Sequence, residues 1–185
     1  MWSFIFSCFK DIGVTVVGGE HHSASSSSFA NKKRKLDGEE KIIRKKPGNK
    51  ADITFVADRM EIGCAEFALS DADDCAKVIG EVGLKCPAML KIMLDKLGEQ
   101  EAGIDQQLNL PGLLIYGNRI IFIFLDMPNK NVTRVTKVGS LAFPSCVEMF
   151  AVPALKLFKH LIVVKQVMKN NLSLLSSAGK DDFFE

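Results

Sequence analysis

Apolar residues follow two different periodicities in this chain from residue 51 onward, and each predicts one kind of element. Residues 52–57 are rich in β-branched and aromatic side chains, which predicts a strand, and residues 60–67 predict a second strand that returns beside it. Between residues 75 and 97, apolar positions recur at steps of three and four, which predicts a helix. Pro87 lies inside this pattern, so we expect it to kink the helix or to begin a new one.

The second half of the chain predicts a meander of strands and a long helix. The apolar residues 113–125 are interrupted by Gly117-Asn118, a pair that favours the positive φ of a tight hairpin. Alternation at 132–143 predicts a third strand with one solvated face, and an apolar stripe predicts a helix over 152–175. This order of elements predicts an α/β (α+β) fold with a mixed central sheet flanked by helices.

The remaining segments differ in composition from this domain. Residues 1–30 predict a poorly defined N-terminal segment, in which the Ser-rich stretch 21–28 should be flexible. Residues 31–50 predict a basic flexible linker, residues 51–176 the α/β domain, and residues 177–185 a loose tail.

The overall composition narrows the class of protein. A chain of 185 residues with 47% hydrophobic residues is globular, which excludes a wholly disordered or collagen-like protein. The five cysteines lack zinc-site spacing and only three histidines are present, so we expect free thiols in a reducing compartment. The apolar segments are too short for a signal peptide or a membrane span, which predicts an intracellular protein without a membrane partner.

The formal net charge of +2 conceals an uneven distribution. Residues 32–50 hold nine Lys or Arg and three acids, a net of +6, and the remainder of the chain therefore carries −4. Two basic clusters are separated by eight residues: Lys32, Lys33, Arg34 and Lys35, then Arg44, Lys45 and Lys46. This is the form of a bipartite nuclear-import signal, which predicts an import carrier as partner and a nuclear location. A solvated linker and a contact with nucleic-acid phosphates beside the first predicted hairpin are open alternatives.

Three acids, Asp52, Glu61 and Glu66, cluster around the first predicted hairpin. If the hairpin loop is the three residues 58–60, Asp52 lies opposite Glu66 on the same face, with the Cβ atoms about 5 Å apart. With a two-residue loop the register slips and the two side chains face opposite ways. Two facing carboxylates repel each other unless a cation lies between them. Hard oxygen ligands with open positions are what Mg²⁺ uses when it carries water and a phosphate oxygen.

The residues of this hairpin resemble a known family. Lys50-Ala51-Asp52, a strand, a turn, and then Cys64-Ala65-Glu66-Phe67-Ala68 resemble the core of the PD-(D/E)XK, or restriction-endonuclease-like, superfamily. More specifically, residues 44–175 resemble uncharacterised nuclease-like proteins abundant in fungi, through the segments 45–52, 63–66, 89–94 and 141–144. The resemblance implies a restriction-endonuclease-like fold, in which a hairpin carries an Asp and then Glu-x-Lys and is followed by a helix and further strands.

The resemblance also implies roles for individual residues. Asp52 and Glu66 match the catalytic, metal-binding carboxylates of a Mg²⁺-dependent phosphodiesterase. The family lysine falls on Ala68, which cannot stabilise the charge that develops on a phosphate, and Lys77 or Lys85 on the next helix is a candidate displaced lysine. We therefore predict a catalytically impaired nuclease-like pseudoenzyme that binds nucleic acid. The alternatives are an active metal-dependent nuclease with a displaced lysine, and a protein-interaction module without nucleic-acid activity.

Overall fold

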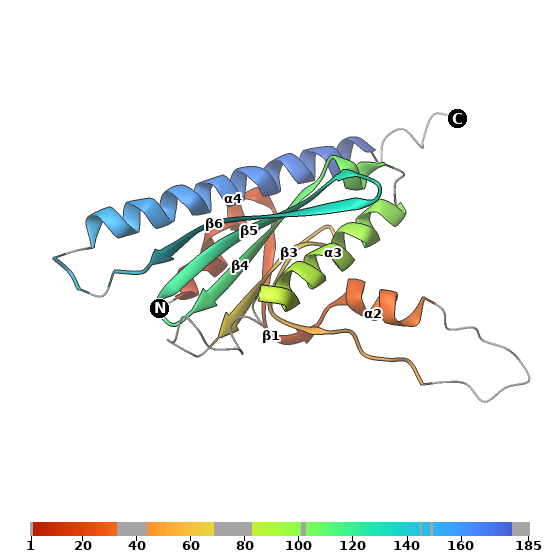
Figure 1. Ribbon diagram of the computed structural model, residues 1–185, viewed down its shortest axis with the longest axis horizontal. Helices are drawn as coiled ribbons and strands as arrows, with labels where there is room; N and C mark the ends of the chain where they lie inside the picture. Colours follow the sequence, from red (N-terminus) through yellow and green to blue (C-terminus); the bar gives the residue numbers. More distant parts are fainter. Residues whose placement is uncertain are drawn as a thin grey trace, which may run out of the picture.

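A mixed sheet forms the centre of the molecule in the computed structural model (Figure 1). The structure describes residues 2–32, 44–68, 83–100, 103–144, 146–148 and 150–178. Within them the sheet has six strands in sequential order: β1 (Thr15–His22), β2 (Lys50–Ala57), β3 (Met60–Ala68), β4 (Asn109–Tyr116), β5 (Arg119–Asn129) and β6 (Val132–Ala142). The β3–β4 pair is parallel and the other neighbours are antiparallel.

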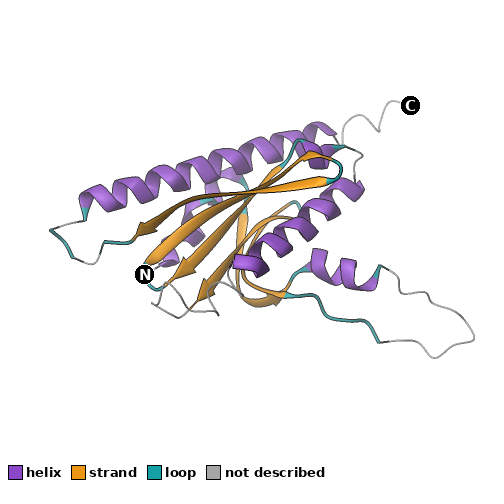
Figure 2. Cartoon of the chain, viewed as in Figure 1, coloured by secondary structure: helices purple, strands orange, loops and turns teal. Residues whose placement is uncertain are grey.

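Helices lie on both faces of this sheet (Figures 1 and 2). The α-helices are α1 (Ile5–Cys8), α2 (Ala24–Asn31), α3 (Gly83–Gln100) and α4 (Ala151–Ala178). One-turn 3₁₀ helices cover Trp2–Phe4, Lys10–Ile12 and Ile104–Gln106. The β3–β4 pair is parallel because the chain crosses from the end of β3 to the start of β4 through α3, as parallel neighbours require.

Each face of the sheet has its own apolar cluster. On one face, α3 contributes Cys86, Leu90 and Met93, which pack with Cys64 of β3 and Leu114 of β4. On the other face, α4 and the first residues of the chain cover the sheet. The buried residues of this second cluster include Ile5, Phe9, Ile53, Phe55, Ala65, Leu157, Leu161, Val164 and Met168. A strand alternates its side chains between faces, so Cys64 and Ala65 belong to different clusters.

Most elements expected from the apolar pattern are present. Strands β2 to β6 and helix α4 lie within a few residues of the predicted segments, and the register of β4 and β5 leaves Gly117-Asn118 as a two-residue loop with φ +51° at Gly117. Helix α3 runs through Pro87 without a break. The predicted helix start and Lys77 lie outside the described residues.

The N-terminal segment is more ordered than the sequence predicts. Strand β1 pairs antiparallel with β2 and extends the sheet ahead of the predicted domain start at residue 51. The prediction of a flexible Ser-rich stretch is wrong, since it contains β1's last residues and most of α2, with Ser25 and Ser26 buried. Ser23 caps this helix by accepting a hydrogen bond from the Ser26 N–H at 3.1 Å, a role for which serine is well suited.

None of the helices in the described part of the chain combines the length and the apolar composition that crossing a membrane requires.

Candidate functional site

Asp52 and Glu66 face each other across β2 and β3 because of an irregularity in the hairpin. The loop is the two residues Asp58 and Arg59, both at positive φ (+48° and +67°), the second of the two alternatives considered for this hairpin. Such a turn alone would place the two carboxylates on opposite faces. A register shift beyond Val56 leaves Ile62 as an extra residue on β3, and this bulge restores the facing arrangement. Beyond it Ile53 pairs with Ala65, so the next residues, Asp52 and Glu66, are opposite.

Glu66 is buried under the first turn of α3. Its side chain is 3% exposed and shares a strand face with Cys64, which belongs to the α3 side of the sheet. Asp52 is half-buried, and its Oδ2 accepts a hydrogen bond of 2.7 Å from the Phe67 N–H. This bond fixes the orientation of the Asp52 carboxylate beside Glu66.

Lys85 supplies a cation to this site from α3. Its Nζ lies 2.7 Å from Oε2 of Glu66. Ala68, at the position of the family lysine, is a buried methyl group in the α3-facing cluster. Of the two candidate displaced lysines, Lys85 therefore reaches the carboxylates, and Lys77 is outside the described residues.

Burial controls the protonation of Glu66. It raises the pKa of the Glu66 carboxyl to about 7, against the opposing effect of the Lys85 ammonium, and the neighbouring Asp52 carboxylate raises this pKa further. Oε1 of Glu66 is buried and has no hydrogen-bond partner among the described residues. A group that binds this oxygen, whether a proton or a cation, would relieve the cost of its burial.

The two carboxylates fit a hard divalent cation. The described residues contain no group of three or more His, Cys, Asp or Glu side chains that could hold a metal ion. However, Mg²⁺ commonly uses one or two protein carboxylates and completes its coordination with water and substrate phosphate. The unpartnered Glu66 Oε1 beside the Asp52 carboxylate is consistent with that donor set.

Glu61, the third acid of the hairpin, has a different use. Its Oε2 accepts hydrogen bonds from the Ser23 hydroxyl at 2.7 Å and the Ser25 N–H at 3.0 Å, and its Oε1 accepts one from the Ala24 N–H at 2.8 Å. A carboxylate at the first N–H groups of a helix is stabilising. Glu61 therefore fixes α2 to the sheet and does not join the other two acids.

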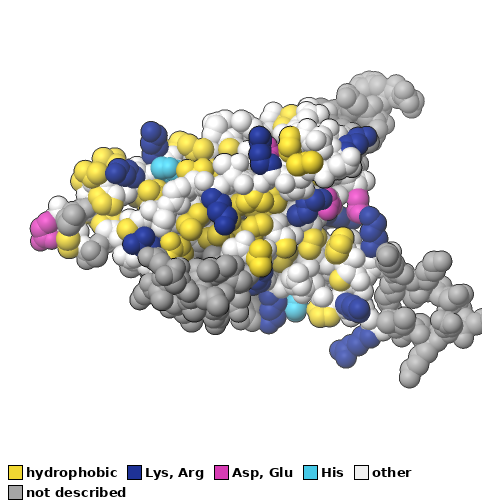
Figure 3. Space-filling view, viewed as in Figure 1, with side chains coloured by type: hydrophobic (Ala, Val, Ile, Leu, Met, Phe, Trp, Pro, Cys, Tyr) yellow, Lys and Arg dark blue, Asp and Glu magenta, His cyan; other side chains and the backbone are white. Residues whose placement is uncertain are grey.

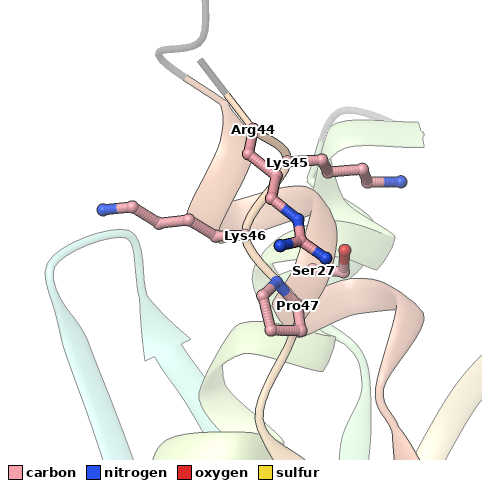
Figure 4. A pocket seen from close by; sticks show the side chains of 5 residues that line it. All are labelled: Ser27, Arg44, Lys45, Lys46 and Pro47. Atoms are coloured by element: carbon pink, nitrogen blue, oxygen red, sulfur yellow. The ribbon is translucent and has the colours of Figure 1, made fainter.

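Arg44, Lys45 and Lys46 of the basic segment lie beside α2, away from the carboxylates, whereas Lys50 is in β2, two residues before Asp52. Figure 4 shows Lys45 and Lys46 extending in opposite directions from the chain, with the Arg44 guanidinium turned toward Ser27. These residues and Pro47 line an open hollow of about 590 Å³.

The separation between residues 44–46 and Glu66 follows from contacts along α3. Lys32, at the end of α2, lies 2.6 Å from Glu99, which is fourteen residues after Lys85, or about 21 Å along the helix. Lys32 and the described cluster 44–46 thus do not lie beside the carboxylates, Lys50 of β2 is two residues from Asp52, and Lys33, Arg34 and Lys35 are outside the described residues.

One further pair of residues at the site has no signal in the amino-acid sequence. The sulfur atoms of Cys64 and Cys86 lie 3.7 Å apart, both fully buried, between β3 and α3. The two cysteines are 22 residues apart in the chain and match no metal or redox spacing. Only the packing of α3 on β3 brings them together.

Comparison of the chain with protein-family models, with curated proteins and with solved structures finds no match. The architecture therefore stands as a mixed α/β fold with a mostly antiparallel open sheet and helices on both faces.

Proposed function

We propose that this protein is a metal-dependent phosphodiesterase that acts on nucleic acid, with its active centre at Asp52, Glu66 and Lys85. The observation that carries this proposal is the 2.7 Å separation between Lys85 Nζ and Glu66 Oε2. The expectation of an impaired enzyme rested on Ala68, and Lys85 offers the missing cation from a neighbouring element.

The order of the elements supports the proposal. Strands β2 and β3 form a hairpin that carries Asp52 and Glu66, α3 follows, and β4 then lies parallel to β3. This is the succession of hairpin, helix and further strand that the resemblance to the restriction-endonuclease-like superfamily implies. We therefore propose that the protein has a restriction-endonuclease-like fold and that its activity depends on a metal ion.

Each of the three residues would have a distinct role in cleavage. Asp52 and Glu66 would hold Mg²⁺ or Mn²⁺, which when bound lowers the pKa of a coordinated water and neutralises phosphate charge. The Phe67 N–H keeps the Asp52 carboxylate in place through the hydrogen bond to Oδ2. The Lys85 ammonium, which lies beside Glu66, would shift toward the phosphate and stabilise the negative charge that grows there, an effect worth roughly 3–4 kcal/mol for well-placed donors.

A second candidate function is nucleic-acid binding without cleavage. It is favoured by the ion pair itself, which occupies one oxygen of Glu66, and by the lack, among the described residues, of any group of three or more side chains that could hold a metal ion. In Figure 3, Lys and Arg side chains outnumber acidic ones over the coloured part of the face in view, which suits a polyanionic partner.

The decisive experiment is a cleavage assay with matched lysine variants. Labelled single-stranded and duplex DNA and RNA would be incubated with the full chain and Mg²⁺ or Mn²⁺. Lys85→Met and Asp52→Asn should each reduce cleavage by at least about a hundredfold. Lys91→Met is the control, because Lys91 is on the same helix, has the same 38% exposed side chain and also forms an ion pair, with Asp95.

The outcomes separate the candidate functions. Cleavage that depends on Lys85 and not on Lys91 would support the phosphodiesterase. Salt-sensitive binding without cleavage would support the second candidate. A lack of nucleic-acid affinity at low salt would contradict both and favour a protein-interaction module.

A further inference from the structure

Two buried thiols lie beside the candidate centre. Cys64 is on β3, two residues before Glu66, and Cys86 is in the first turns of α3, next to Lys85. Both side chains are 0% exposed, and their sulfur atoms are 3.7 Å apart. The two contacts that join β3 to the start of α3, one sulfur–sulfur and one carboxylate–ammonium, are therefore adjacent.

We propose that Cys64 and Cys86 form a reversible disulfide that cross-links β3 to α3 at the candidate centre. The oxidant would be a low-molecular-weight disulfide such as oxidised glutathione. One cysteine thiolate attacks it and releases one small thiol, and the second cysteine displaces the other small thiol from the mixed disulfide. The protein loses two protons and two electrons, and the oxidant is reduced to two thiols.

The geometry allows this bond with a small movement. A disulfide has an S–S length of about 2.05 Å, so the sulfur atoms must approach by roughly 1.7 Å from their present 3.7 Å. No side chain separates Cys86 from the sheet, because the β4 residue beneath it is Gly112, where an added Cβ would lie 2.8 Å from the Cys86 sulfur. Both sulfurs are thus confined to the same small space between the two elements.

The start of α3 can provide the movement and the access. The first N–H groups of any α-helix lack an intrahelical acceptor, and Pro87 has no N–H to donate. The segment that carries Cys86 is consequently held by few helical hydrogen bonds and can open locally.

The cross-link has a consequence for the neighbouring ion pair, and this part rests on the proposed function. A disulfide between Cys64 and Cys86 would fix Lys85 against Glu66. The lysine could then no longer shift toward a substrate phosphate, so we expect the oxidised protein to cleave at least about tenfold more slowly than the reduced protein.

The test uses a variant in which Cys8, Cys75 and Cys146 are replaced by Ser, so that only the proposed pair remains. After incubation with oxidised glutathione at pH 8, peptide mapping by mass spectrometry should find the Cys64–Cys86 cross-link, and no free thiol should be titratable in denaturant. The wild-type protein should yield the same linked peptide, which covers the case of a poorly folded variant.

Thermal unfolding provides an independent readout. Closing a loop of 22 residues should raise the Tm of the oxidised protein by about 6–12 °C, and a reductant should reverse the increase. Adding Cys86→Ala to the variant should abolish both the linked peptide and the increase in Tm. Two titratable thiols that persist in the variant and in the wild-type protein, after the same treatment has fully oxidised a small dithiol, would overturn the proposal.

Failure of this proposal is distinguishable from failure of the proposed function. A cross-link in a protein that never cleaves nucleic acid would leave the disulfide standing and contradict the phosphodiesterase. Cleavage by a protein whose thiols resist oxidation would do the reverse.

Discussion

The ammonium group of Lys85 lies 2.7 Å from Oε2 of Glu66, so α3 delivers a cation to a carboxylate that β3 buries to 3% exposure. The remaining oxygen of Glu66 has no partner among the described residues. One oxygen of Glu66 is thus paired and the other is not. The charge of Glu66 should therefore depend on the position of α3, on pH and on divalent cations, and each dependence can be measured without a substrate.

Removing the lysine should expose the cost of the buried carboxylate. We expect Lys85→Met to lower the free energy of unfolding at pH 8 by about 1–3 kcal/mol, because Glu66 would lose its charge-assisted hydrogen bond. Urea denaturation would measure the change. Lys91→Met, which breaks a surface pair with Asp95, should stay within about 0.5 kcal/mol of the wild type. An equal loss in both variants would show that the Lys85–Glu66 pair is no more important than a surface contact.

Protonation of Glu66 should make stability depend on pH in an identifiable window. Its pKa is about 7 in the folded protein against the ordinary 4.5, so the folded state binds the proton more tightly. The resulting stabilisation is complete below pH 4.5 and is lost as the pH rises through 7, up to about 3 kcal/mol.

The control for this prediction is Glu66→Gln, which cannot titrate. Urea denaturation at pH 5 and pH 8 should show a smaller loss of stability between the two pH values in the variant than in the wild type. Identical losses in both proteins would mean that Glu66 does not carry this dependence.

Divalent cations should reverse the effect of high pH. Mg²⁺ or Mn²⁺ at ten times its Kd would stabilise the folded protein by about 1.4 kcal/mol at pH 8, and Asp52→Asn should remove most of this gain. At pH 5.5 a proton competes for Glu66, so the gain should shrink. Calorimetric unfolding scans with and without the metal would measure it. A gain that is unchanged in Asp52→Asn would place the cation elsewhere.

The attachment of α2 should depend on Ser23. Its hydroxyl donates to Glu61 at 2.7 Å and also accepts from the Ser26 N–H, and the side chain is 1% exposed. We expect Ser23→Ala to cost about 1–2 kcal/mol and to increase amide exchange within Ala24–Asn31. Ser28→Ala, at an exposed position of the same helix, is the control and should change stability by less than about 0.5 kcal/mol.

The basic segment should affect nucleic-acid affinity and not the chemical step. Replacing Arg44, Lys45 and Lys46 by Ala should weaken binding and reduce the slope of log K against log salt by up to about 3. Single-turnover cleavage at saturating protein should be unchanged, because Lys46 pairs with Asn31 of α2, at the end of α3 opposite to Lys85.

A triple variant on the opposite face of the sheet is the control for charge. Lys156, Lys159 and Lys169 of α4 are exposed, and replacing them by Ala removes the same net charge. If both triple variants lose the same affinity, binding follows overall charge and not the basic segment.

Much of the sheet could be predicted from the sequence because its signals are local. The apolar segments of β4 and β5 flank a Gly-Asn pair that specifies a tight turn, and the apolar stripe of α4 recurs along a helix of 28 residues. In each case the residues that define the element are close together in the chain, so the element can be recognised from the sequence without knowledge of the fold.

The candidate site depends on features that have no local signal. Asp58 and Arg59 form the turn at positive φ without a glycine, and nothing in the sequence marks Ile62 as the bulged residue that turns Glu66 toward Asp52. The Ser-rich stretch forms a helix because its buried acceptor, Glu61, arrives from 36 to 38 residues away. Lys85 was one of two candidates because the position of the crossover helix over β3 is set by packing alone.

The parallel pairing of β3 and β4 also determines the order in which the candidate centre is assembled. Asp52 and Glu66 meet within one hairpin, an event of microseconds in isolated peptides, whereas Lys85 arrives with a crossover that spans the forty residues between Ala68 and Asn109. Long-range pairing of this kind closes later than local contacts. We therefore expect the two acids to meet during folding before their cation is in place, with water solvating both carboxylates until α3 packs over them.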